Sequence, residues 1–119
     1  MLRCGIDMIE VERVTEGIAR HGERFLTRFF TAAERDLCGE KAYRLAARIA
    51  AKEAVAKALG TGIGDVSWQE IEILSDERRR PVLILHGAAA QLSQDLGLTE
   101  WDVSLTHTDT HASAVAVAQ

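Results

Sequence analysis

The sequence predicts one α+β domain in which a long helix packs on a small, mainly antiparallel sheet. Residues 44–59 are rich in Ala, Leu, Arg, Lys and Glu and contain no proline, which is typical of a helix that ends at Gly60. Short apolar segments near both ends of the chain have the length and composition of strands. With 119 residues and no linker, repeat or low-complexity tract, residues 1–119 are predicted to form a single domain.

The overall composition argues against several classes of protein. A net charge of −4 and a pI near 5.5 disfavour a general nucleic-acid binder. Cys4 and Cys38 lack metal-type spacing, so we expect buried free thiols in a reducing compartment. The N-terminus carries an acid too early for a signal peptide, and no apolar run approaches the roughly 20 residues of a membrane helix. We therefore expect a cytoplasmic protein that binds neither nucleic acid nor membrane.

The first strand is expected over residues 2–9, an apolar run interrupted by Asp7. Two interpretations of Asp7 have equal weight on this segment alone: a functional acid, or the cap of the helix that follows. That helix is predicted over residues 11–29, where apolar residues have helical spacing. Gly22 lies within it and marks a kink or a break.

The polar side of this first helix carries four arginines at offsets of seven, eleven and fifteen residues: Arg13, Arg20, Arg24 and Arg28. A solvated helix face normally mixes both signs of charge. In an acidic protein, such a stripe predicts a docking surface for an acidic partner, although a merely solvated face has about the same weight.

A second helix is predicted to begin at Thr31, because Thr31 and Glu34 match the capping-box pattern. Glu34 therefore has a structural interpretation, and the helix is expected to end near Cys38. The long helix follows, and Arg44, Arg48 and Lys52 recur along it every four residues as one basic stripe.

Glu53 and Lys57 lie beside that stripe, one helical turn apart. Such a pair usually decorates a solvated face, but here it stands among basic residues and precedes a glycine-rich turn at residues 60–64. Basic side chains and free loop amides suit phosphate groups, and a single carboxylate suits a hard cation such as Mg²⁺.

The C-terminal half has a different pattern. Residues 70–85 predict a β-hairpin with a charged turn at 76–80, and residues 87–96 predict a short helix that ends at Gly97. Strands are predicted over residues 101–108 and 112–118. His107 lies at the end of the first of these, among hydroxyl groups that can bind a phosphate or can simply form a polar strand end.

Three blocks of the sequence, taken together, resemble one family. The blocks are G-I-D-M-I-E-V-E-R at 5–13, A-A-R-I-A-A-K-E-A-V-A-K-A-L-G-T-G-I-G at 46–64 and V-S-L-T-H-T at 103–108. The segment R-F-F-T-A-A-E-R at 28–35 and the Arg80-Pro81 pair also fit. Over nearly its whole length the chain resembles the holo-acyl-carrier-protein synthases, the small homotrimeric subclass of the 4′-phosphopantetheinyl transferases.

The resemblance implies the fold of that superfamily, a homotrimer with active sites between subunits, and an Mg²⁺-dependent transferase. Such an enzyme moves 4′-phosphopantetheine from coenzyme A to a serine of apo-acyl carrier protein and releases adenosine 3′,5′-bisphosphate. The family's metal-binding acids correspond to Asp7 and Glu53, its motif lysine to Lys57 and its carrier-docking arginine to Arg13. The general base is left open between Glu53 and a metal-bound water.

Further residues are expected to contact coenzyme A, and they come from three parts of the chain: Arg48, Lys52 and Lys57; Gly60, Thr61 and Gly62; and Pro81, Ser104, His107 and Thr108. The chain departs from the family pattern at Ile49, where an aromatic residue is common, and at His111 in the last turn. The carrier partner belongs to fatty acid synthesis or to a polyketide pathway.

Two other functions compete with this interpretation. One is a binding module that holds coenzyme A or a carrier without transferring anything. The other is an Mg²⁺-dependent enzyme that acts on a different pyrophosphate, such as a nucleotide hydrolase. The pair of acids with Lys57 disfavours simple binding, and the arginine stripe favours a protein substrate.

Overall fold

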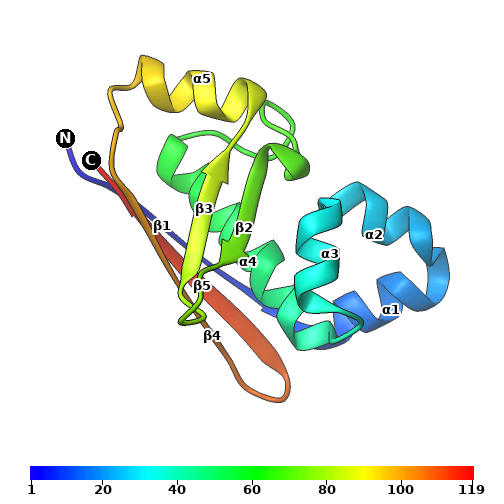
Figure 1. Cartoon of the computed structure of the whole chain (residues 1–119). Coiled ribbons are helices and arrows are strands. Elements are labelled where there is room, and N and C mark those ends of the chain that lie inside the picture. The colour runs from blue at the N-terminus through cyan, green and yellow to red at the C-terminus, as the bar shows by residue number, and fades with distance from the viewer.

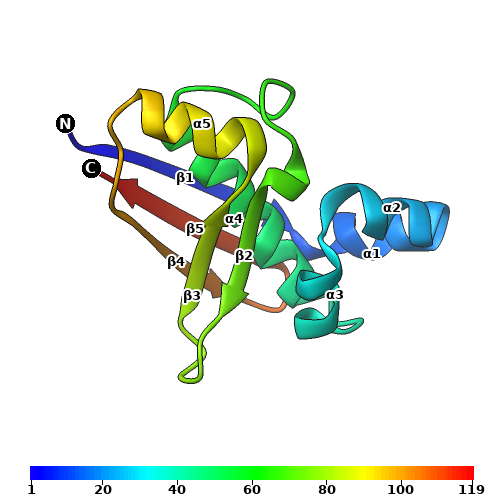
Figure 2. The same ribbon diagram turned by 45° about the horizontal axis from the view of Figure 1, so that its top comes forward.

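The computed structural model describes all 119 residues, and the long helix α4 (Ala42–Leu59) lies at its centre (Figures 1 and 2). Around α4 the chain forms β1 (Arg3–Glu10), α1 (Val11–His21), α2 (Glu23–Phe29), α3 (Ala32–Cys38), the 3₁₀ turn η1 (Trp68–Glu70), β2 (Ile71–Ser75), β3 (Pro81–Leu85), α5 (Gly87–Asp95), β4 (Trp101–His107) and β5 (His111–Ala118). None of these helices is long and apolar enough to cross a membrane.

Two antiparallel sheets lie on different sides of α4. The larger sheet has the strand order β1-β5-β4, and the smaller is the β2–β3 hairpin. In the larger sheet, Asp7 pairs with Ala114, and His107 pairs with Ala112 on the other side of β5. Figure 2 shows α4 between this sheet and the hairpin, with α1, α2 and α3 gathered near one end of α4.

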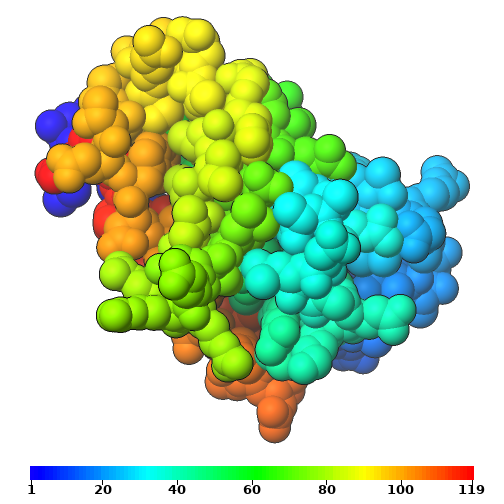
Figure 3. Space-filling model, viewed as in Figure 1, coloured from blue at the N-terminus to red at the C-terminus, as the bar shows by residue number.

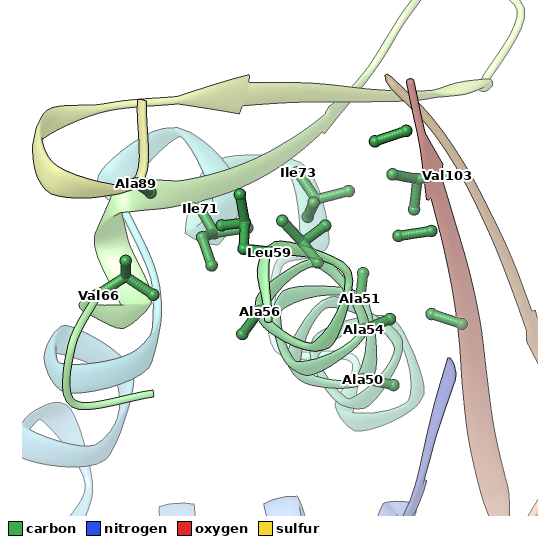
Figure 4. Close-up of a cluster of buried hydrophobic side chains, with 14 of the residues drawn as sticks. Ala50, Ala51, Ala54, Ala56, Leu59, Val66, Ile71, Ile73, Ala89 and Val103 are labelled. Atoms are coloured by element: carbon green, nitrogen blue, oxygen red, sulfur yellow. The ribbon is translucent and has the colours of Figure 1, made fainter. Parts of the chain in front are cut away.

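Small residues allow α4 to approach the larger sheet closely. Ala50, Ala51 and Ala54 are fully buried and point toward the sheet (Figure 4). Gly5 on β1 has no room for a side chain, because a Cβ there would lie 1.9 Å from the carbonyl oxygen of Ala54. The alanine-rich composition of α4 and β5 is therefore what brings β1 against the helix.

The opposite side of α4 packs on larger side chains. Ile71 and Ile73 of β2 are fully buried there with Leu59 at the end of α4 (Figure 4). A second cluster, which includes Val14 and Phe30, fills the space between the N-terminal part of α4 and helices α1–α3. Helix α4 ends at Gly60, whose φ of 80° is left-handed, as expected from the sequence.

Most predicted elements are confirmed, and so is the break expected within residues 11–29: Gly22 adopts a φ of 53° and ends α1 before α2 begins. Two other expectations are wrong. Because of this break, the four arginines Arg13, Arg20, Arg24 and Arg28 do not form one stripe on a continuous helix, although all four are exposed. Cys38 is buried as expected, but Cys4 is exposed on the outer face of β1.

A buried ion pair joins α3 to α4. Thr31 and Glu34 form the predicted capping box, and Glu34 also accepts a hydrogen bond from the backbone N–H of Ile73. The Lys52 ammonium lies 2.8 Å from the Glu34 carboxylate and donates to the carbonyl oxygens of Trp68 and Ile71 at 2.9 and 2.6 Å. Both charged side chains are fully buried, and burial lowers the pKa of Lys52 while Glu34 opposes that shift.

We expect Gly5→Ala to lower the free energy of unfolding by about 3 kcal/mol, because the added methyl group pushes β1 away from α4. Urea denaturation followed by circular dichroism would measure the change. Gly62→Ala is the matched control, since a Cβ at Gly62 meets nothing within 4 Å. Equal stability of the two variants would contradict the close approach.

We expect Lys52→Ala to lower the free energy of unfolding by about 4 kcal/mol, because it leaves the Glu34 carboxylate buried without its cation. The same denaturation experiment applies. Lys57→Ala is the control, because its ammonium is half exposed and its ion pair is expected to contribute less than about 1 kcal/mol. A loss of that small size at Lys52 would contradict the structural role.

Candidate functional site

Two carboxylates meet where β1 crosses α4. Asp7 and Glu53 line the same pocket, and the ammonium of Lys57, one turn after Glu53, lies 3.2 Å from Asp7 Oδ1. Lys57 also donates to the carbonyl oxygen of Ile6 at 2.9 Å. Asp7 caps no helix, because α1 has Glu10 at its N-cap position and no side-chain capping bond. The capping interpretation of Asp7 is therefore wrong.

The electrostatics of this pair favour a bound cation. Partial burial raises the pKa of Glu53, the negative charge of Asp7 raises it further, and Lys57 opposes both effects. No set of three or more His, Cys, Asp or Glu side chains is grouped closely enough to hold a metal ion, so the donor set here is two carboxylates. That set fits Mg²⁺, which keeps several water ligands when bound by one or two carboxylates.

The pocket around the two acids has a volume of about 400 Å³. Arg13, at the start of α1, lines it and brings a positive charge to the side of the acids. Phe25, Phe29 and Trp68 supply apolar walls, and the ring centroids of Phe29 and Trp68 lie 4.7 Å apart. The site therefore combines an acid pair, two basic groups and an apolar surface.

A second pocket, of about 570 Å³, lies near the N-terminal end of α4 between the tip of the β2–β3 hairpin and β4. Figure 3 shows a hollow there, between the yellow-green hairpin, the turquoise start of α4 and the orange end of β4. Four residues predicted to contact coenzyme A line this pocket together: Arg48, Pro81, Ser104 and His107.

Residues that were not predicted as site residues also line the second pocket. Arg44 and Arg79 add two positive charges, and the Tyr43 ring packs on His107 with centroids 4.6 Å apart. Arg44 was recognised only as part of a stripe, although its spacing of four residues from Arg48 indicates a shared face. Arg79 had no signal beyond its place in a basic turn before Pro81.

One predicted ligand is contradicted by the structure. Lys52 is fully buried, and its three hydrogen bonds to Glu34 and two backbone carbonyls use all the donors of its ammonium. It cannot bind a phosphate group. Arg48 is also largely buried and donates to Ser75 Oγ at 2.9 Å and to the Ile73 carbonyl at 3.4 Å, yet it still lines the second pocket.

The remaining predicted residues lie apart from both pockets. Gly60, Thr61 and Gly62 follow the far end of α4, where Thr61 Oγ1 donates to Asp65 at 2.5 Å. Thr108 lies in the exposed β4–β5 turn, and its hydroxyl oxygen accepts from the backbone N–H of Thr110 at 3.3 Å. Within one chain, the structure thus separates the predicted coenzyme A ligands into groups at the two ends of α4.

Comparison with known proteins places this arrangement in a family. The family model for the 4′-phosphopantetheinyl transferase superfamily matches residues 3–116. The chain is 49% identical to the holo-[acyl-carrier-protein] synthase of Moorella thermoacetica, over 100% of this chain and 94% of the relative. It is 45% identical to that of Herpetosiphon aurantiacus, over 98% of both chains.

The fold agrees with the sequence comparisons. The crystal structure of Helicobacter pylori holo-[acyl-carrier-protein] synthase in complex with coenzyme A superposes with a TM-score of 0.90. That match has 30% sequence identity and covers 98% of this chain and 99% of the other. The expected α+β fold is confirmed, and the chain belongs to the 4′-phosphopantetheinyl transferase superfamily and, within it, to the holo-[acyl-carrier-protein] synthases.

Proposed function

We propose that this enzyme transfers 4′-phosphopantetheine from coenzyme A to a serine of an apo-acyl carrier protein. The serine oxygen forms a bond to the phosphorus that carries the pantetheine, the pyrophosphate P–O bond breaks, and adenosine 3′,5′-bisphosphate leaves. The observation that carries the proposal is the pocket that Asp7, Glu53 and Arg13 share, with Lys57 beside Asp7. The chain needs no nucleophile of its own, because the carrier supplies the serine.

Asp7 and Glu53 would hold Mg²⁺, which when bound neutralises charge on the pyrophosphate. The Lys57 ammonium is half exposed and already turned toward Asp7, so it can donate to a phosphate oxygen at the same place. The proton of the serine hydroxyl passes to a base, and the candidates for that base are Glu53 and a water molecule.

Coenzyme A binding is proposed to need more than one copy of the chain. The second pocket is lined by Arg48 and His107. Gly60 lies about 18 Å from Arg48 along the axis of α4, at a rise of 1.5 Å per residue. A compact ligand can contact both the second pocket and the glycine turn where the pocket of one copy faces the glycine turn of another copy. This separation supports active sites between subunits, as in the homotrimer that the family resemblance implies.

The outer face of the larger sheet also supports assembly. Ile6 and Met8 of β1 are 65% and 64% exposed, and Val115 and Val117 of β5 are exposed beside them. Exposed apolar side chains on adjacent strands form the kind of patch that marks a protein–protein contact. We propose that this face packs against other copies of the chain, and that the trimer acts in the cytoplasm.

We expect an apo-acyl carrier protein to gain the mass of phosphopantetheine when it is incubated with this enzyme, coenzyme A and Mg²⁺. Intact-mass spectrometry measures the gain. Asp7→Ala and Glu53→Ala, and a chelator added to the wild type, are each expected to slow the transfer at least 100-fold. Lys57→Ala is informative beside them, because it removes the ammonium and keeps both acids.

Other outcomes distinguish the competing functions. No mass gain with carriers of fatty acid and polyketide synthesis, despite coenzyme A binding, would indicate a binding module. Release of adenosine bisphosphate without any carrier would indicate a hydrolase. Full activity of both acid variants would remove the metal site from the proposal.

We expect Arg13→Glu to raise KM for the carrier by about 10-fold and to leave the affinity for coenzyme A unchanged. Carrier proteins of this class are acidic, and Arg13 is exposed beside the two acids. Steady-state kinetics with varied carrier would measure KM. Arg78→Glu, an identical change of charge on the distant β2–β3 turn, is the control, and equal KM values for the two variants would refute a docking role for Arg13.

A further inference from the structure

The tip of the β2–β3 hairpin holds an unusual backbone conformation. Arg79 is the only residue other than glycine with a positive φ, at 65°. An L-amino acid is disfavoured there because its Cβ crowds the backbone, so glycine is the residue that such a turn normally selects. An arginine at this position calls for a reason outside the turn itself.

Hydrogen bonds hold the turn in this conformation. Asp76 Oδ1 accepts from the backbone N–H groups of Arg78 and Arg80 at 2.8 and 2.9 Å. The backbone N–H of Arg79 donates to the carbonyl oxygen of Asp76 at 3.0 Å. None of these bonds uses the Arg79 side chain, so the guanidinium is not needed to form the turn.

The Arg79 side chain lines the second pocket, where arginines outnumber acids. Arg44 and Arg48 line the same pocket, together with the imidazole of His107. The four ion pairs of the structure involve Arg35, Lys52, Lys57 and His86 as cations, so none of the three arginines of the pocket has a carboxylate within 4.0 Å. Asp76 is the one acid among the lining residues, and its Oδ1 accepts from the two turn amides, so three guanidinium groups face a single carboxylate.

Like charges held together in a pocket repel one another, and a bound anion relieves that repulsion. Arginine suits phosphate particularly well, because its planar guanidinium donates two parallel hydrogen bonds to phosphate oxygens. The rigid turn fixes the position of the Arg79 backbone, so the side chain loses less conformational entropy when it binds a ligand. The position, charge and hydrogen-bonding geometry of these arginines therefore all favour a ligand that carries a phosphate group.

We propose that Arg79 is a phosphate-binding residue that helps the second pocket to select the doubly phosphorylated nucleotide end of coenzyme A. This assignment rests on the proposed function for the identity of the nucleotide. The strained turn is then a device that directs an arginine into the pocket, at some expense of stability. Glycine at this position would suit the backbone better and bind the nucleotide less well.

The test compares Arg79→Gly with Arg78→Gly, its neighbour in the same turn, which does not line the pocket. The probe is adenosine 3′,5′-bisphosphate, titrated by calorimetry, with thermal melting of each variant. We expect Arg79→Gly to raise Kd roughly 10-fold, the size of one lost charge-assisted contact, without lowering Tm. Arg78→Gly is expected to change Kd less than about 2-fold, and Arg79→Lys to restore part of the affinity.

Three results would overturn the assignment: an unchanged Kd in Arg79→Gly, an equal rise in Arg78→Gly, or a fall in Tm that accompanies the loss of affinity. Failure of the wild type to bind the bisphosphate would instead count against the proposed function. Inorganic pyrophosphate, titrated into the same variants, then decides whether Arg79 binds phosphate at all. If the wild type binds neither the bisphosphate nor pyrophosphate, both the proposed function and the assignment of Arg79 are refuted.

Discussion

The contact between β1 and α4 at Gly5 is the constraint on which the candidate site depends. A strand can lie this close to a helix backbone only where one residue has no side chain and its neighbours are small. Gly5 faces the carbonyl group of Ala54, and the next residue of β1 on that face is Asp7. On α4, Glu53 directly precedes Ala54. The packing contact and the pair of acids are therefore parts of one local geometry.

Helix α4 also separates two polar regions, one in which acids and basic groups are balanced and one in which arginines predominate. The acids and Lys57 lie around its middle and C-terminal part, whereas the arginine-lined pocket lies near its N-terminal end. Buried contacts hold the helix on both sides: alanines against the larger sheet, and the Glu34–Lys52 pair beneath the hairpin. A rigid central helix keeps the two regions of one chain at a fixed separation, which is why the proposed coenzyme A site takes its parts from different copies of the chain.

The sequence predicted local features well, because their signals are local. The capping box at Thr31, the strand alternation and the glycine ends of α4 and α5 all act within a few residues. The burial of Lys52 could not be predicted in this way. Alanine and basic residues occupy nearly every face of α4, and both sides are covered by distant segments, so helical spacing does not distinguish the solvated side. The role of Arg79 could not be predicted from the sequence, because its positive φ is a property of the folded turn.

The two hydrophobic clusters divide the molecule into two packing units that can unfold locally at different energetic cost. Residues of α4 and both sheets form the larger cluster, and α1–α3 cover the smaller one. Helix α2 has seven residues, none of them fully buried, and α1 buries only Val14. Local unfolding of α1 and α2 therefore uncovers the smaller cluster and leaves the larger cluster, with β1 on α4, in place. The element that carries Arg13 therefore belongs to a different packing unit from the contact that sets the spacing of the acids.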